Sequence, residues 1–237
     1  MRSILITFVA FCSCLLITSA TAQTTNMNSK DASAQHTLTY LALGDSYTIG
    51  EMVPADQSYP NQVVVLLSKK GRHINSPTII AKTGWRTDEL IQGIAGANLT
   101  QKYDIVTLLV GVNNQYQNRD TAIFRTEFVQ LLKTSITFAN DNKHHVFVLS
   151  IPDWGVTPFA NGRNLEKIAE QIDAYNRINK EESKKVGVNY IDITSLYREI
   201  GDDPAYLAAD KLHPSGKMYE KWAKIVAKAI EGQLRKE

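Results

Sequence analysis

The chain has 237 residues, of which 43% are hydrophobic and 21% are charged, and this is typical of a globular protein of one domain or a tight pair. Its formal net charge of +2 gives no reason to expect nucleic acid or an anionic membrane surface as the main partner. The five histidines are scattered and no Cys/His cluster has the spacing of metal ligands, so we expect neither a metal site nor a cofactor.

The first 22 residues are expected to be a secretory signal peptide rather than part of the fold. A short positive start precedes a mostly apolar stretch at 4–18, and Ala20-Thr21-Ala22 has the small-x-small pattern of a cleavage site. The apolar stretch is too short and wrongly flanked for a stable transmembrane span. We therefore expect a secreted or periplasmic protein that is cleaved after Ala22 and has no membrane span in its mature form.

Both cysteines, Cys12 and Cys14, lie inside this segment, so the cleaved chain would contain no cysteine and no disulfide. Lipid attachment at Cys14 is the alternative, although residues 11–13 fit a lipoprotein cleavage box poorly. Residues 23–37 are rich in Thr, Ser, Asn, Gln and Ala, which predicts a flexible leader. A single folded domain is expected at 38–237.

Strands and helices alternate along this domain. In chain order, the apolar runs and helical spacing predict a strand at Leu38–Leu43, a helix at Tyr59–Lys70, strands at Thr78–Ala81 and Asp104–Val110, a helix at Thr121–Ala139, a strand at Val146–Ile151, a helix at Leu165–Val186, a strand at Val188–Ile191 and a helix at Ser215–Leu234. This alternation implies a five-stranded parallel sheet in a three-layer α/β/α sandwich. Ligands of such sheets bind beyond the carboxyl ends of the strands.

The loops at those strand ends carry a consistent set of polar residues. Ser46 follows the first strand, Gly84 follows the second in "AKTGWRT", and Asn113 follows the third in "LLVGVNNQ". Asp210 and His213 stand three residues apart in "AADKLHPSG", just before the last helix. The set fits acyl transfer, because a serine hydroxyl needs a base such as imidazole, an acid to orient that base, and donors for the oxyanion.

In this order, Gly44-Asp45-Ser46, Gly84, Gly111-Val112-Asn113 and Asp210-x-x-His213 resemble the four sequence blocks of the SGNH hydrolases, also called GDSL esterases and lipases. The resemblance spans most of the predicted domain. It implies a flavodoxin-like α/β/α fold and metal-free hydrolysis of carboxylic esters.

The resemblance also implies a role for each residue. Ser46 would be the nucleophile and one oxyanion donor, Gly84 and Asn113 would be the other donors, His213 would be the base, and Asp210 would orient that base. The third block of the family usually ends in Asp, where this chain has Asn114, so we expect no role for Asn114.

Other residues near these blocks remain open to two interpretations. We read Asp45 as structural, holding the turn through backbone hydrogen bonds. The aromatic side chains of Trp85, Trp154 and Phe159 would either line a pocket or fill the core beneath the loop after the fourth strand.

The substrate class also stays open. Short-chain acyl or acetyl esters, including those on polysaccharides, compete with the acyl chains of lysophospholipids or simple lipids. The lack of a long apolar lid segment favours short-chain esters. A non-catalytic carbohydrate-binding protein on the same fold is a third alternative, against which the intact Ser46, Asp210 and His213 argue.

Overall fold

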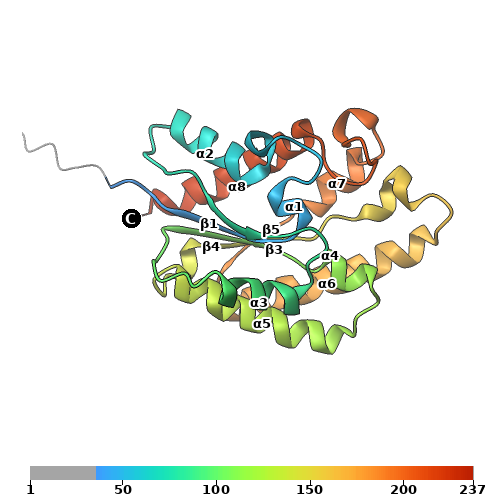
Figure 1. Cartoon of the computed structure of the whole chain (residues 1–237), viewed down its shortest axis with the longest axis horizontal. Helices are drawn as coiled ribbons and strands as arrows, with labels where there is room; N and C mark the ends of the chain where they lie inside the picture. The colour runs from blue at the N-terminus through green and yellow to red at the C-terminus, as the bar shows by residue number, and fades with distance from the viewer. Residues whose placement is uncertain (1–35, 237) are drawn as a thin grey trace, which may run out of the picture. The chain divides into compact units, whose positions relative to one another are not determined.

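A five-stranded, fully parallel β-sheet forms the centre of residues 36–236, the part of the chain that this computed structural model describes (Figure 1). The strands are β1 (Tyr40–Gly44), β2 (Thr78–Ala81), β3 (Ile105–Leu109), β4 (Val146–Leu149) and β5 (Asn189–Ile191). Their order across the sheet is β2-β1-β3-β4-β5. Every residue of β1 and β3 is buried, because helices cover both faces of the sheet, and this explains their continuous apolar runs.

Helices form a layer on each face of the sheet (Figure 1). One layer contains α2 (Tyr59–Lys69) and α8 (Gly216–Leu234), which pack together, and the other contains α3 (Thr87–Gly96), α5 (Thr121–Phe138) and α6 (Leu165–Val186). The short helices α1 (Ser46–Ile49), α4 (Val112–Tyr116) and α7 (Thr194–Ile200) follow β1, β3 and β5. The predicted three-layer α/β/α sandwich is confirmed.

Buried aromatic side chains join the sheet to the α2 and α8 layer. The hydroxyls of Tyr40 and Tyr59 lie 3.0 and 3.2 Å from the hydroxyl of Thr107, and Trp222 of α8 is fully buried. Burial raises the pKa of Tyr59 to about 12, so this hydroxyl stays neutral. The ring centre of Trp222 lies 6.2 Å from that of Tyr47, so this packing connects α1, which contains Ser46, to α8, which follows His213.

The predicted strands and long helices are all present, and their ends differ from the prediction by at most two residues. Four α-helices lie outside the predicted set: α3 and the short helices α1, α4 and α7. Glycine is a poor helix former, and α3 contains Gly93 and Gly96. Tertiary packing explains why residue 93 is a glycine: a Cβ at this position would lie 2.1 Å from the ring of Trp85. Helix α7 has only seven residues, which is too short for a clear periodic pattern.

The predicted signal peptide, both cysteines and leader residues 23–35 lie outside the described residues, so the boundaries at 22 and 37 stay predictions. His36 is the first described residue, and its Nε2 lies 2.8 Å from a carboxylate oxygen of Asp104. Between residues 36 and 236, no helix is long and apolar enough to cross a membrane.

Candidate active site

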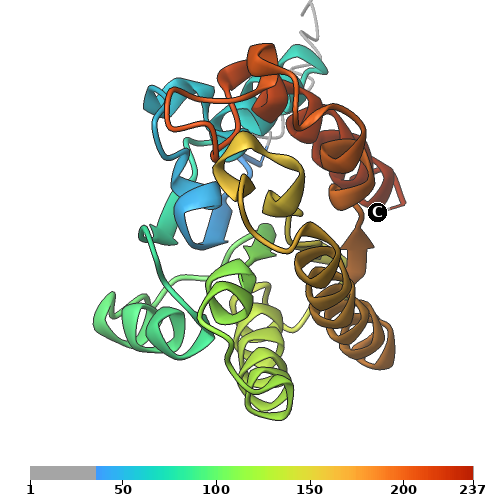
Figure 2. The same cartoon turned by 90° about the vertical axis from the view of Figure 1, so that its right-hand side faces the viewer.

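The turns after β1, β2 and β3 and the loop before α8 meet at the carboxyl edge of the sheet, which faces the viewer in Figure 2. The connection after β1 runs to β2 on one side, whereas the connection after the adjacent strand β3 runs to β4 on the other side, so the two diverge between β1 and β3. This is the topological switch point at which open α/β sheets bind ligands.

Ser46 is held at this edge by a tight turn. It is the first residue of α1, and the preceding Asp45 caps the helix by accepting a hydrogen bond from the backbone amide of Tyr47 at 3.0 Å. The predicted structural role of Asp45 is consistent with this contact. Burial raises the pKa of the Asp45 carboxyl from 3.8 to about 7, although its hydrogen bonds oppose the shift.

His213 lies between Ser46 and Asp210. Its Nε2 is 3.0 Å from the Ser46 hydroxyl, and its Nδ1 is 2.5 Å from one carboxylate oxygen of Asp210. The other Asp210 oxygen accepts hydrogen bonds from the backbone amides of Leu212 and His213, both at 3.0 Å. The ring centre of Tyr47 lies 5.0 Å from that of the His213 imidazole, and this packing limits the rotation of the imidazole. The structure therefore brings Ser46 next to the Asp210 and His213 pair, which lies far from it in the sequence.

Partial burial alone would raise the pKa of Asp210, but hydrogen bonds from the ring and backbone of His213 outweigh it, and the pKa is lowered. The carboxylate is therefore ionised at neutral pH. In this state it accepts the Nδ1 proton and leaves Nε2 of His213 free to accept the proton of the Ser46 hydroxyl.

Gly84 and Asn113 lie beside Ser46. Gly84 has a φ of +82°, a left-handed conformation that favours glycine, and the space where a side chain would project is open. The Asn113 amide nitrogen donates to the backbone oxygen of Trp85 at 3.1 Å and lies 3.4 Å from an Asp45 carboxylate oxygen. Among residues 36–236, no hydrogen bond is made by the backbone amide of either Ser46 or Gly84.

Four of the five predicted site residues, Ser46, Gly84, Asn113 and His213, line one cavity of about 230 Å³. The fifth, Asp210, lies behind His213 and does not reach the cavity. A larger surface hollow of about 700 Å³, between α6, β5 and α7, contains none of these residues. Among the described residues, no group of three or more His, Cys, Asp or Glu side chains is arranged to hold a metal ion.

An aromatic wall, consisting of Tyr116, Trp154 and Phe159, closes one side of this cavity. Trp154 is buried, and its indole nitrogen donates to the side-chain oxygen of Gln115 at 2.7 Å. The sequence left open whether Trp85, Trp154 and Phe159 line a pocket or fill the core. Trp154 and Phe159 line the cavity, whereas Trp85 packs against Gly93 of α3.

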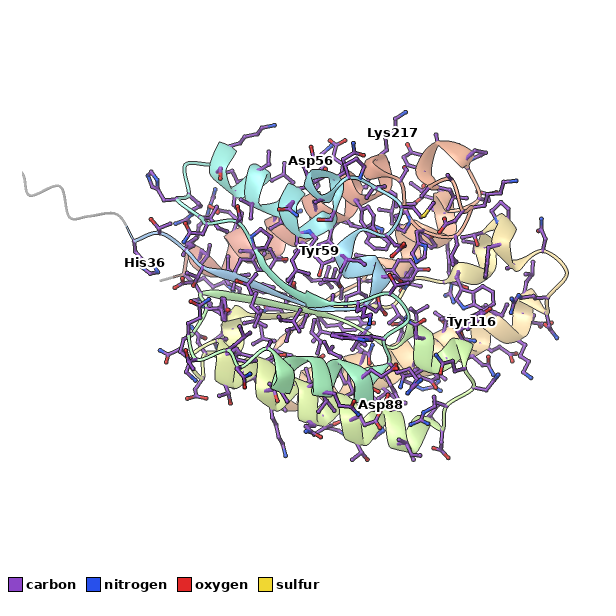
Figure 3. All side chains as sticks on the ribbon, viewed as in Figure 1. His36, Asp56, Tyr59, Asp88, Tyr116 and Lys217 are labelled. Atoms are coloured by element: carbon purple, nitrogen blue, oxygen red, sulfur yellow. The ribbon has the colours of Figure 1, made fainter. Side chains whose placement is uncertain are left out.

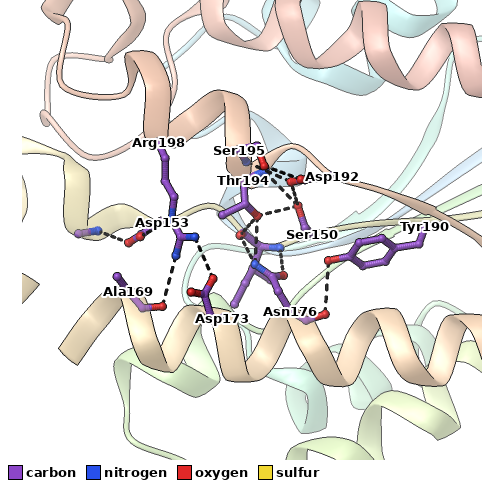
Figure 4. A network of polar contacts seen from close by, with 12 residues as sticks. Ser150, Asp153, Ala169, Asp173, Asn176, Tyr190, Asp192, Thr194, Ser195 and Arg198 are labelled. Carbon is purple, nitrogen blue, oxygen red and sulfur yellow. Dashed lines mark hydrogen bonds and ion pairs between the residues drawn. The ribbon is translucent and has the colours of Figure 1, made fainter. Parts of the chain in front are cut away.

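The loop that carries Trp154 is tied to α6 and α7 (Figure 4). The side chain of Asn176 bonds both the amide and the carbonyl of Ile151, at 2.8 and 3.0 Å. Arg198 donates to the buried carboxylate of Asp153 at 2.8 Å, next to Trp154. Because these partners come from distant segments, the sequence alone could not identify them.

Asn114 has a structural role that the sequence did not reveal. It is fully buried; its side-chain oxygen accepts the backbone amide of Thr87 at 3.1 Å and its nitrogen donates to the Thr87 hydroxyl at 2.7 Å. Asn114 thereby fixes the first residue of α3 to α4. The sequence assigned this position no role in the site, and the structure gives it one in the fold. The sequence showed only that Asn114 replaces the usual Asp of the family, and this difference did not predict the contact with Thr87.

Comparisons with known proteins agree with this geometry. A model of the GDSL-like lipase/acylhydrolase family matches residues 42–221. The spore germination lipase LipC of Bacillus licheniformis is 25% identical over 220 residues, which cover 84% of this chain and 99% of that protein.

Two solved structures share the fold. The lipase/acylhydrolase from Enterococcus faecalis has a TM-score of 0.64 at 21% identity, covering 83% of this chain and 96% of its own. The acetyl xylan esterase AlAXEase has a TM-score of 0.65 at 18% identity, covering 81% of this chain and all of its own. The family resemblance predicted from the four blocks is thus confirmed, and the chain belongs to the GDSL-like lipase/acylhydrolase family as a carboxylic ester hydrolase.

Proposed function

We propose that this ester hydrolase acts through an acyl-enzyme on Ser46 and that its substrates are esters of short acyl groups. The observation that carries the first part is the chain of contacts from Ser46 through His213 to Asp210 at one end of the cavity. The observation that carries the second part is the small volume of that cavity.

In the first half-reaction, Nε2 of His213 accepts the hydroxyl proton of Ser46 as the serine oxygen attacks the ester carbonyl. Asp210 stabilises the imidazolium that forms. The negative charge develops on the carbonyl oxygen, and the backbone amides of Ser46 and Gly84 are unused donors close to it. The Asn113 amide nitrogen donates to the backbone oxygen of Trp85 at 3.1 Å and to an Asp45 carboxylate oxygen at 3.4 Å, and it would exchange the longer bond to Asp45 for one to the oxyanion.

The tetrahedral intermediate collapses when the imidazolium of His213 gives its proton to the leaving alcohol. In the second half-reaction, His213 takes a proton from water, the resulting hydroxide attacks the acyl-enzyme, and the acid leaves as Ser46 regains its proton. Every atom is accounted for: one ester and one water give one alcohol and one carboxylic acid.

The cavity supports a short acyl group. Sites for drug-sized ligands have volumes of about 300–1,000 Å³, and this cavity has about 230 Å³. Trp154 is 3% exposed and is fixed by Gln115, so it forms a firm wall. A long acyl chain would have to displace this ring or leave the cavity.

Hydrolysis of lysophospholipids or simple lipids is the second candidate, and one observation favours it. Tyr116, Phe159 and Leu165 are 43%, 38% and 50% exposed, and the first two line the cavity. Exposed apolar side chains at a cavity could contact an acyl chain that extends beyond it. The similarity to a lipase also supports this alternative.

A series of p-nitrophenyl esters from acetate to dodecanoate separates the two candidates, with acetylated xylan and lysophosphatidylcholine assayed beside it. We expect kcat/KM to be highest for acetate to butyrate and to fall for longer chains. A maximum at decanoate or dodecanoate, with hydrolysis of lysophosphatidylcholine, would support the lipid substrate instead. Ser46→Ala serves as the control for background hydrolysis.

We also propose export, on the basis of the sequence of residues 1–22. Intact mass and N-terminal sequencing of the mature protein test this proposal. A chain that begins at Gln23 supports secretion, and a lipid on Cys14 supports the anchored alternative. A chain that retains its N-terminus in the cytoplasmic fraction would contradict both.

A further inference from the structure

Arg163 rests against the outer side of the aromatic wall. Its guanidinium carbon lies 5.1 Å from the ring centre of Trp154, 5.2 Å from that of Tyr116 and 5.4 Å from that of Phe159. One of its terminal nitrogens donates to the Tyr116 hydroxyl at 3.1 Å. The side chain is exposed, and Figure 3 shows Tyr116 at the end of the molecule that holds the cavity.

This arginine has no acidic partner within the described part of the chain. Arg125 and Arg198, by contrast, each pair with carboxylates, of Glu181 and Asp153 respectively. A guanidinium has five N–H donors, and only one contact of Arg163, with Tyr116, uses them here. Its remaining donors have no hydrogen-bond partner among the described residues, and the side chain is exposed beside residues that line the cavity.

The three rings also hold the guanidinium in place. A cation over an aromatic face is attracted by the ring quadrupole, and a planar guanidinium stacks on such faces. Less side-chain entropy is then lost when a ligand binds. The arrangement combines an unpaired positive charge with a fixed position, and both favour recognition of an anion.

We propose that Arg163 is a specificity-determining residue that binds an anionic group, a carboxylate or a phosphate, on the alcohol part of the ester substrate. The proposal rests on the proposed function: if a short acyl group fills the cavity, the alcohol part extends past the aromatic wall towards solvent, where Arg163 lies. The anion would be carried by an acidic sugar or by a phosphorylated alcohol.

Three acetate esters with similar leaving groups test the proposal: 4-acetoxybenzoate, 4-acetoxyphenyl phosphate and the neutral methyl 4-acetoxybenzoate. The measured quantity is the selectivity ratio, kcat/KM for an anionic ester divided by kcat/KM for the neutral ester. Comparison of this ratio between wild type and variant cancels the intrinsic reactivity of each ester. It also cancels any loss that affects all esters equally.

We expect Arg163→Gln to lower the selectivity ratio roughly threefold to tenfold, mainly through KM, as befits a charge-assisted contact at an exposed site. Arg163→Lys keeps the charge but loses the planar guanidinium, so its selectivity ratio should lie between those of the wild type and Arg163→Gln. Arg177→Gln is the matched control, because Arg177 is also exposed and lies in the hollow between α6 and α7, away from the cavity. A larger effect on the carboxylate ester indicates an acidic sugar, and a larger effect on the phosphate ester indicates a phosphorylated alcohol.

An unchanged ratio in Arg163→Gln would overturn the proposal and leave Arg163 as a support for the wall. The same conclusion would follow if Arg177→Gln changed the ratio as strongly. The failure of the proposed function would look different: Ser46→Ala would then still hydrolyse all three esters, whatever the ratio in the Arg163 variants.

Discussion

Two sides of the cavity differ in what their residues contact: on the polar side, Ser46 and His213 contact each other, whereas in the aromatic wall Trp154 is held by a residue outside the wall. On the polar side, Asp210 fixes His213 from three residues away, and His213 meets Ser46 directly. In the wall, Trp154 depends on Gln115, from another helix. In the proposed mechanism the first set moves protons, and the second set shapes the space beside them. Substitutions on the two sides should therefore change different quantities, the rate of chemistry on one and selectivity on the other.

The largest effect is expected on the polar side. Ser46→Ala or His213→Ala should lower kcat by about three orders of magnitude or more, because the two residues act as one unit in proton transfer and attack. The double variant should be little worse than either single variant. Steady-state kinetics measure this, with the thermal midpoint as a check that the fold is kept. Near-full activity in Ser46→Ala would remove the mechanism.

Asn113→Ala should have the next largest effect. It removes one proposed oxyanion donor, which costs about 2.7–4 kcal/mol of transition-state stabilisation in comparable sites. The loss should appear in kcat rather than in KM, because the oxyanion exists only during the reaction. Kinetics on one short ester test it. Unchanged kcat would mean that Asn113 does not contact the oxyanion.

Substitution of the neighbouring Asn114 should affect stability rather than catalysis. Asn114→Ala leaves the buried amide of Thr87 without its partner, and we expect the free energy of unfolding to fall by about 1–3 kcal/mol. Urea unfolding measures the loss. The kcat of the folded variant should fall far less than in Asn113→Ala. If Asn114→Ala were the crippled enzyme and Asn113→Ala were normal, the oxyanion assignment would be wrong.

A smaller change is expected from the wall. Trp154→Leu enlarges the cavity and should raise the ratio of kcat/KM for p-nitrophenyl octanoate over acetate by about tenfold. Trp85→Leu is the matched control, since the Trp85 ring packs on α3 and does not line the cavity. The control should lower stability and leave the ratio unchanged. Equal shifts in both variants would show that the wall does not select the acyl chain.

The last prediction concerns Asp45 and the pH dependence of stability. Burial raises its pKa from 3.8 to about 7, so the folded protein binds this proton more tightly than the unfolded chain does. The contribution of Asp45 to stability is therefore full below about pH 4 and is lost as the pH rises towards 7. Asp45→Asn keeps an oxygen to cap α1 but cannot ionise.

The variant should thus gain stability relative to wild type between about pH 4 and pH 7, and the difference should then level off. Urea unfolding across this range measures it. A difference that stays constant with pH would contradict the raised pKa.

The same contrast explains what the sequence could predict. Periodicity located the five strands and the four long helices. The polar residues in the turns after the strands and before the last helix predicted that Ser46 and His213 share one site, and the structure places Nε2 of His213 3.0 Å from the Ser46 hydroxyl. Helix α3 was missed because Gly93 weakens its pattern, and only the ring of Trp85 explains that glycine. The positions of Trp154 and Arg163 depend on contacts with Gln115 and Tyr116, which lie far from them in the sequence. A local sequence pattern does not predict such contacts.

The most direct test of the central proposal is the site of covalent labelling by a fluorophosphonate, which reacts with activated serines. We expect activity to fall in step with the addition of one phosphonyl group, and peptide mass mapping to find that group on Ser46. Ser46→Ala should remain unlabelled under the same conditions. A label on another residue, or equal labelling of Ser46→Ala, would contradict an acyl-enzyme on Ser46.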